Sequence, residues 1–188
     1  MIDIENLRDT IAPKSDQLNA DDLVGSTKKI ITVTKGKRTG SAQQPIAVEY
    51  EGAKGKPFKP CLTMRKILLA LWTDDGHNWI GKSMKLYRDD SVVWAGEKTG
   101  GVRISHMSGI TKQERIMLQV AKGKRKEFVI DVLPSYPDAD FAEKSPQWIA
   151  AIKAEKITLE EVIQKASVTG VLTKEQIEIL KGAVNNGN

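Results

Sequence analysis

The sequence predicts a mainly β protein with some helix: an OB-like small antiparallel barrel, interrupted by one helix and followed by a C-terminal helical unit. Short stretches rich in β-branched residues alternate apolar and polar side chains, and turns of glycine and lysine separate them. One stretch, residues 61–73, instead repeats apolar residues at helical spacing. The OB fold is a five-stranded barrel that often holds oligonucleotides. Strand order cannot be read from periodicity, so a different small barrel or an α+β sheet also fits.

The first elements predict a hairpin. Residues 1–20 carry no regular pattern, and we expect them to be poorly structured. The β-branched stretch Leu23–Thr34 predicts a strand with a bend at Gly25, and the alternation in residues 46–50 predicts a second strand. The turn KGKRTGSAQQ lies between them, so this hairpin should have a long basic tip.

Strands dominate again after the helix. They are expected at residues 82–88, near 92–94 and at 102–107. Residues 115–121 and 127–133 then predict a second hairpin with KGKRK at its tip. The sequence KGKR therefore occurs twice, each time at a predicted hairpin tip.

The chain changes character after the last predicted strand. Residues 21–133 are expected to form the basic barrel domain, and residues 134–146, which include three prolines, predict a linker. Residues 147–188 predict a helical tail. Its segments TLEE and TKEQ match the capping box, in which two side chains each bond the other's backbone N–H at a helix start.

The composition excludes a membrane-spanning helix. The chain has 188 residues, of which 28% are charged, and no stretch approaches 18 consecutive apolar residues. Its first ten residues are acidic and lack the build of a secretory signal. The single cysteine, Cys61, cannot form an internal disulfide. We therefore expect a cytoplasmic protein.

The net charge of +5 is unevenly distributed. Residues 1–20 carry 2 basic and 4 acidic side chains, residues 21–132 carry 21 and 12, and residues 133–188 carry 6 and 8. The middle is thus a basic body, at +9, between two acidic ends. This balance favours a polyanionic partner, and nucleic acid is the commonest one in a cytoplasm. Lysines that only keep the protein soluble would give the same balance.

Residues 76–83, GHNWIGKS, match the phosphate-binding pattern G-x-x-x-x-G-K-[ST]. In nucleotide hydrolases that loop follows a strand and opens a helix, whose N-terminal N–H groups hold the phosphates. Here the predicted order is reversed, because a helix precedes the loop and a strand follows it. We therefore predict that the segment is not a nucleotide-hydrolase loop.

Catalytic patterns are scarce. His77 and His106 lie far apart and lack metal-ligand spacing, and Cys61 carries no sign of activation. The pair Asp89–Asp90 is compatible with nuclease chemistry, yet no glutamate is followed two residues later by lysine, so we expect the pair to form a turn. We expect no enzymatic activity, no metal and no cofactor.

Binding of single-stranded nucleic acid fits the sequence better. Six of the ten aromatic residues lie between residues 50 and 94, interleaved with lysines and arginines. In single-strand binders, aromatic side chains stack on bases and basic side chains contact phosphates. Tyr87 is the leading stacking candidate because it alternates out of phase with apolar neighbours, and Trp79 and Phe58 are further candidates. The predicted nucleic-acid-binding residues are Lys35, Lys37, Arg38, Lys56, Phe58, Lys59, Trp79, Lys82, Lys85, Tyr87, Arg88, Arg103, Lys122, Lys124 and Arg125.

The stretch WIGKSMKLYRDDSVVWAGEKTGGVRISHMS, preceded by PFKPCLTMRKILLALW, resembles a set of small phage-encoded proteins. They share a W-I-G-K…L-Y…G…I-R-I core and are related to OB-fold single-stranded-DNA-binding proteins. The resemblance covers about residues 57–108 and implies that Trp79–Lys82 enters a barrel strand. The helix start CLTMRK departs from the asparagine-rich start found in that set.

We therefore expect a phage or prophage protein, in the host cytoplasm, that binds single-stranded DNA in replication or recombination. The alternative is a protein-interaction module, such as an adaptor or an inhibitor of a host complex, that docks through residues 147–188. A homo-oligomer is compatible with either function, and we expect no membrane partner.

Overall fold

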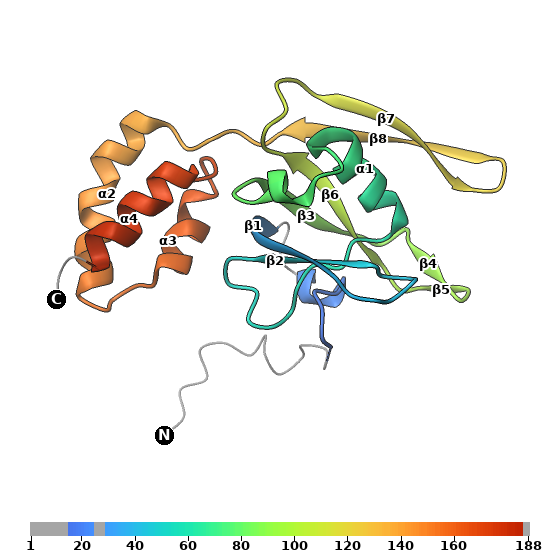
Figure 1. Cartoon of the computed structure of the whole chain (residues 1–188), viewed down its shortest axis with the longest axis horizontal. Helices are drawn as coiled ribbons and strands as arrows, with labels where there is room; N and C mark the ends of the chain where they lie inside the picture. Colours follow the sequence, from blue (N-terminus) through green and yellow to red (C-terminus); the bar gives the residue numbers. More distant parts are fainter. Residues whose placement is uncertain (1–14, 25–28, 186–188) are drawn as a thin grey trace.

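The structure is a computed structural model and describes residues 15–24 and 29–185 (Figure 1). It contains a six-stranded sheet, a two-stranded hairpin and four α-helices. The elements are η2 (Asp21–Leu23), β1 (Lys29–Arg38), β2 (Ile46–Tyr50), α1 (Leu62–Trp72), η3 (Gly76–Trp79), β3 (Ser83–Asp89), β4 (Val93–Trp94), β5 (Glu97–Lys98), β6 (Gly101–Met107), β7 (Glu114–Ala121), β8 (Lys124–Val132), α2 (Asp138–Lys153), α3 (Leu159–Ala166) and α4 (Lys174–Asn185).

The six-stranded sheet is mostly antiparallel and open. Its order is β2-β1-β3-β6-β8-β7, and only the β6–β8 pair is parallel. The expected mixture of antiparallel strands and helices is therefore present. Closure into a barrel is not, because no pairing among the described residues joins the edge strands β2 and β7. The two predicted hairpins are β1–β2 and β7–β8.

Strand β1 changes partner along its length. Its first part, Lys29–Thr32, pairs with β3, and its second part, Val33–Arg38, pairs with β2. The register shifts between Val33 and Lys35, which marks a bulge where the strand bends. Side chains are buried from Ile31 to Val33 and exposed from Thr34 onward, so the basic end of β1 extends away from the core. The bend predicted at Gly25 lies outside the described residues.

Helix α1 packs in the main core and contacts β6. It buries Met64, Ile67, Leu68 and Trp72 at helical spacing, and burying such a side chain contributes about 1.5–3 kcal/mol. The Met64 sulfur accepts a hydrogen bond of 3.3 Å from the Ile104 N–H of β6. The helix thus satisfies a strand edge that β8 leaves unpaired, and it packs in the same core as the sheet.

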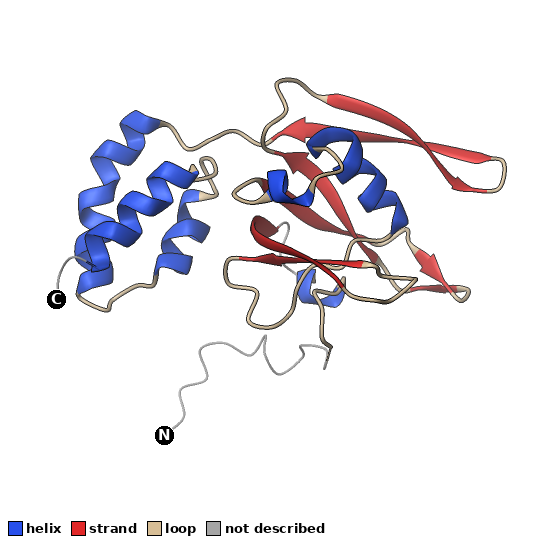
Figure 2. Ribbon diagram, viewed as in Figure 1, coloured by secondary structure: helices blue, strands red, loops and turns tan. Residues whose placement is uncertain are grey.

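The C-terminal helices form a separate unit with their own core (Figure 2). The sequence expectation of a linker up to residue 146 is wrong in its second part, since α2 begins at Asp138 and contains Pro146. The apolar stripe of Phe141, Trp148 and Ile152 runs past this proline, and its burial keeps the helix continuous. A proline in a helix interior normally breaks it, which explains the error.

The connection to the helical unit is short and closely held. The Tyr136 N–H donates to the Val171 carbonyl at 2.7 Å, and the Val171 N–H donates to Pro134. A Cβ on Gly170 would lie 2.7 Å from the Ser135 carbonyl oxygen, so only glycine fits there.

Both predicted capping boxes are present. The Thr158 hydroxyl accepts from the Glu161 N–H at the start of α3, and Glu161 returns the bond. At the start of α4, Thr173 and Gln176 form the same reciprocal pair. These local patterns are sufficient to place both helix starts.

Residues 15–24, which we call the strap, run beneath the sheet and are more ordered than expected. Leu18 and Leu23 are buried in the main core, and the Leu18 N–H donates to the Pro57 carbonyl. This corrects the prediction of poor structure for residues 15–20, while residues 1–14 lie outside the described part. No helix in the described part of the chain is long and apolar enough to cross a membrane.

Candidate nucleic-acid interface

The antiparallel pair β3–β6 brings an aromatic and several basic side chains together. Tyr87 lies directly opposite Arg103, and Lys85 lies opposite His106. Side chains alternate faces along a strand, so Lys85 and Tyr87 share the face opposite to the buried Met84 and Leu86, as the sequence predicted. Both side chains are half-buried.

A carboxylate lies within this group. Asp89 follows Tyr87 on the same face, and its carboxylate is 3.8 Å from Arg103 and 4.0 Å from Lys126. Partial burial opposes its ionisation, but hydrogen bonds from Ser91 and the two cations outweigh that and lower the pKa of Asp89. Burial and then the Asp89 charge raise the pKa of the Tyr87 phenol. The tyrosine is therefore neutral near pH 7.

The basic tip of the β7–β8 hairpin starts beside this group. Lys126 reaches Asp89, and Lys124 and Arg125 immediately precede it on β8. The tip residues Lys122, Lys124 and Arg125 are exposed. Figure 1 shows this hairpin projecting away from the helical unit. We call Lys85, Tyr87, Arg103 and Lys126 the Tyr87 site. Sequence reasoning missed Lys126, although the run KGKRK contains it.

The second basic tip belongs to β1. Lys35, Lys37 and Arg38 are exposed on the part of β1 that pairs with β2. Lys37 forms an ion pair of 2.9 Å with Glu49 on the neighbouring strand. In the described part of the chain, Lys35 and Arg38 have no such partner.

Two predicted stacking residues are core residues instead. Phe58 is 1% exposed and Trp79 is 5% exposed. The Trp79 ring lies 6.2 Å from that of Trp72, and its indole N–H donates to the Thr73 carbonyl. Neither ring can stack on a base in this structure, so their assignment to the binding site is wrong. Trp79 is the last residue of the four-residue helix η3, which is too short for a periodic pattern to indicate burial.

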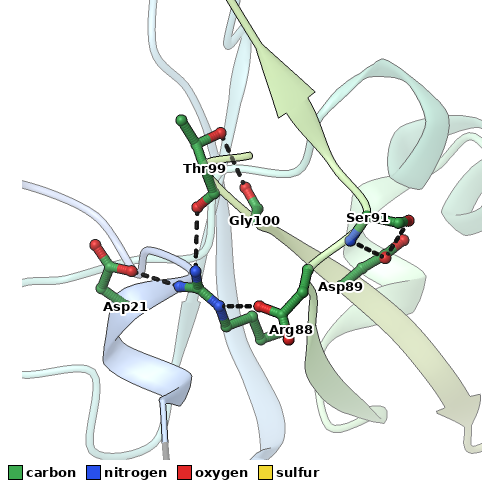
Figure 3. A network of polar contacts seen from close by, with 7 residues as sticks. Asp21, Arg88, Asp89, Ser91, Thr99 and Gly100 are labelled. Atoms are coloured by element: carbon green, nitrogen blue, oxygen red, sulfur yellow. Dashed lines mark hydrogen bonds and ion pairs between the residues drawn. The ribbon is translucent and has the colours of Figure 1, made fainter. Parts of the chain in front are cut away.

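Three predicted phosphate contacts are already paired with the strap. Lys59 is 2.6 Å from Asp16, and Lys56 is 3.4 Å from Asp22. Arg88 donates to Asp21 and Asp90 and to the Thr99 carbonyl (Figure 3). A Cβ on Gly100 would lie 2.8 Å from the Arg88 guanidinium carbon, so this glycine makes room for the arginine.

The GHNWIGKS segment comprises η3, a short connection and the first residue of β3, and its last three amides are hydrogen-bonded. Helix α1 precedes it and β3 follows it, as predicted. The Gly81 N–H donates to Val33, the Lys82 N–H to Trp79, and the Ser83 N–H to the Ser108 hydroxyl. The Lys82 ammonium lies 5.8 Å from the Trp72 ring centre. These N–H groups are therefore not free to hold a phosphate.

The histidines and the cysteine do not converge. The exposed His77 ring forms a hydrogen bond with the Asp75 carboxylate. The His77 backbone N–H and this ring bond both lower the pKa of Asp75. His106 bonds Ser105 on the β6 strand. Cys61 is exposed before α1, with its sulfur 3.5 Å from Arg103. Among the described residues, no three histidine, cysteine, aspartate or glutamate side chains are grouped as metal ligands.

Comparison with known proteins identifies no relative. No known family model matches the chain, and no curated protein or solved structure matches it at a significant level.

Proposed function

We propose that the protein binds single-stranded DNA across the Tyr87 site and the adjoining β7–β8 tip. The observation that carries this proposal is the cross-strand pair Tyr87–Arg103, with Lys85 on the same face of β3 and Lys126 beside the shared carboxylate of Asp89. An aromatic ring among cations is the combination that holds bases and phosphates at once.

The strand arrangement supports the same proposal. The sheet contains the strand order β1-β3-β6-β8-β7. Its one parallel pair is β6–β8, and the strand between them in sequence, β7, lies at the edge of the sheet. The OB fold is a partly open, five-stranded Greek-key barrel that binds oligonucleotides on its second and third strands and on neighbouring loops. In an OB-like reading of this sheet, those strands are β3 and β6, and one loop is the β7–β8 tip.

The binding mode follows from the side chains. The neutral Tyr87 ring would stack on a base, while Lys85, Lys124 and Arg125 would contact phosphates. Asp89 would hold Arg103 and Lys126 in place, since its carboxylate is near both. Affinity would fall steeply with salt, because each phosphate contact releases counterions.

Charge reversal tests the proposal. The double variant Lys85→Glu, Lys124→Glu should lose about hundredfold in affinity for a labelled single-stranded oligonucleotide, since a charged contact contributes about 1.5–3 kcal/mol. The control, Lys153→Glu with Lys156→Glu, makes the same charge change on exposed residues of the helical unit. Equal affinities for the two variants would rule out the assigned surface. Because residues 57–108 resemble phage-encoded proteins, we propose that this binding serves phage replication or recombination.

The helical unit favours a second candidate function, docking of a protein partner. It has its own core, and Val168 and Ile179 on its surface are 90% and 53% exposed. Deleting residues 138–188 separates the two functions. DNA binding should survive the deletion if the sheet carries it, whereas a partner held by the helices would be lost.

A further inference from the structure

The strap places its aspartates on cations of the adjoining loop and strand. Asp16 pairs with Lys59, Asp22 with Lys56, and Asp21 with Arg88 (Figure 3 shows the last of these). In each pair the partner lies at least 34 residues away in sequence. The strap itself, residues 15–24, contains three acidic residues and no basic one.

The three cations, which we call the strap cations, lie within reach of one short segment. Asp16 and Asp22 are six residues apart, and a chain extends by at most about 3.6 Å per residue. Their partners therefore lie within about 22 Å of one another, apart from the reach of the side chains. A row of carboxylates on a row of cations resembles the contact that a few successive phosphates would make.

The strap's backbone is anchored, but two of its carboxylates can exchange partners. Leu18 and Leu23 are buried in the main core and fix the segment. The side chains of Asp16 and Asp21 are 83% and 61% exposed, so they can turn into solvent while the backbone stays in place. Their partners Lys59 and Arg88 are 14% and 21% exposed. Ion pairs with one exposed member contribute little to stability, so phosphate can compete with the aspartates.

We propose that the strap is a built-in competitor of DNA, whose aspartates occupy Lys56, Lys59 and Arg88 and so weaken binding. The inference rests on the proposed function, because it concerns how far the bound strand extends beyond the Tyr87 site. A DNA strand long enough to reach the strap cations would displace Asp16 and Asp21 first. Short strands would contact the Tyr87 site alone.

Neutralising the strap tests this inference. The variant Asp16→Asn, Asp21→Asn, Asp22→Asn keeps the side-chain shapes and removes the strap's negative charge from the three cations, while Arg88 keeps its ion pair with Asp90. Its affinity for a single-stranded oligonucleotide of about 30 nucleotides should rise about tenfold at low salt. Its plot of log affinity against log salt should steepen by about 2, since each added phosphate contact contributes about 0.7.

A matched control removes the effect of net charge. The variant Glu143→Gln, Glu155→Gln, Glu160→Gln makes the same charge change on exposed residues of the helical unit. Adding Lys56→Gln, Lys59→Gln and Arg88→Gln to the strap variant should abolish the gain. Asp16→Asn alone, at the most exposed of the three carboxylates, should give a smaller gain and guards against misfolding of the triple variant.

The outcomes separate this inference from the proposed function. If the wild type binds and the strap variant matches its control in affinity and salt slope, the strap only anchors the chain and the inference is wrong. If neither wild type nor strap variant binds any oligonucleotide, both the inference and the proposed function are wrong. A gain that the added glutamines remove supports both.

Discussion

Two groups of basic residues lie near β3, and they differ in what their charges contact. Lys85, on the Tyr87 site, has no ion-pair partner in the described part of the chain, and Arg103 and Lys126 share the single carboxylate of Asp89. Lys59 and Arg88, by contrast, each bind an aspartate of the strap. Both groups look alike in the sequence.

The difference shows that positive charge alone does not define a binding site. A lysine that already has a carboxylate partner must lose it before it can contact phosphate, whereas an unpaired lysine only loses water and counterions. The Tyr87 site also has an aromatic ring among its cations, which the strap cations Lys56, Lys59 and Arg88 lack. We therefore place the primary contact at the Tyr87 site.

The largest expected effect separates core aromatics from the binding aromatic. Phe58→Ala and Trp79→Ala should each destabilise the fold by about 3–5 kcal/mol, because they empty buried volume. Tyr87→Ala, at a half-buried position on the sheet surface, should cost far less stability. Thermal or urea unfolding of the three variants measures this. A Phe58→Ala protein as stable as Tyr87→Ala would contradict the burial of Phe58.

The next effect concerns stacking. Tyr87→Ala should weaken single-stranded DNA binding by about 1–3 kcal/mol, while Tyr87→Phe, which keeps the ring, should bind nearly as the wild type. Fluorescence anisotropy with folded protein checks both. Equal losses for the two variants would mean that the hydroxyl, rather than the ring, makes the contact.

A smaller effect tests the paired cations. Lys56→Gln with Lys59→Gln should change the affinity of the wild-type protein by about twofold or less, since screened surface pairs contribute little. Lys85→Gln with Lys124→Gln, which removes the same charge from unpaired residues, should weaken binding more than tenfold. The same titration serves for both. If the two double variants lose equal affinity, the distinction between the groups fails.

The smallest expected effect is on the pKa of Tyr50, which depends in part on Asp22 of the strap. Burial, followed by the charges of Asp22 and Glu49, raises the pKa of Tyr50 to about 12. The folded state therefore favours the neutral phenol. This contribution to stability is fully present below the unfolded pKa of about 10 and is lost as pH rises from there through 12. Asp22→Asn should lower the pKa of Tyr50 modestly, as measured by the absorbance of tyrosinate. An unchanged titration would show that Asp22 is not close to the phenol.

The sequence was sufficient for local structure. Period-two alternation gave β7, β8 and the outward direction of Tyr87, and the capping patterns gave the starts of α3 and α4. These features depend on neighbours within a few residues, so the pattern contains the information. The reversed order of helix and strand around GHNWIGKS was also predictable for this reason.

Long-range contacts were not predictable. Whether the edge strands β2 and β7 pair, and which carboxylate Arg88 contacts, depend on parts of the chain that are distant in sequence. The contact of Trp79 with Trp72 depends on how the chain turns between them. No local periodicity encodes such contacts. Pro146 is a case in which a local preference gave the wrong result. Proline disfavours a helix interior, but the packing of the apolar side of α2 keeps the helix continuous through it.

The most direct test of the central proposal compares single- and double-stranded oligonucleotides of about 30 nucleotides, titrated with wild-type protein at about 50 mM and 200 mM salt. We expect a preference for the single strand, and an affinity that weakens sharply at the higher salt. Absence of single-strand binding at the lower salt would mean that the Tyr87 site is only a solvated basic surface.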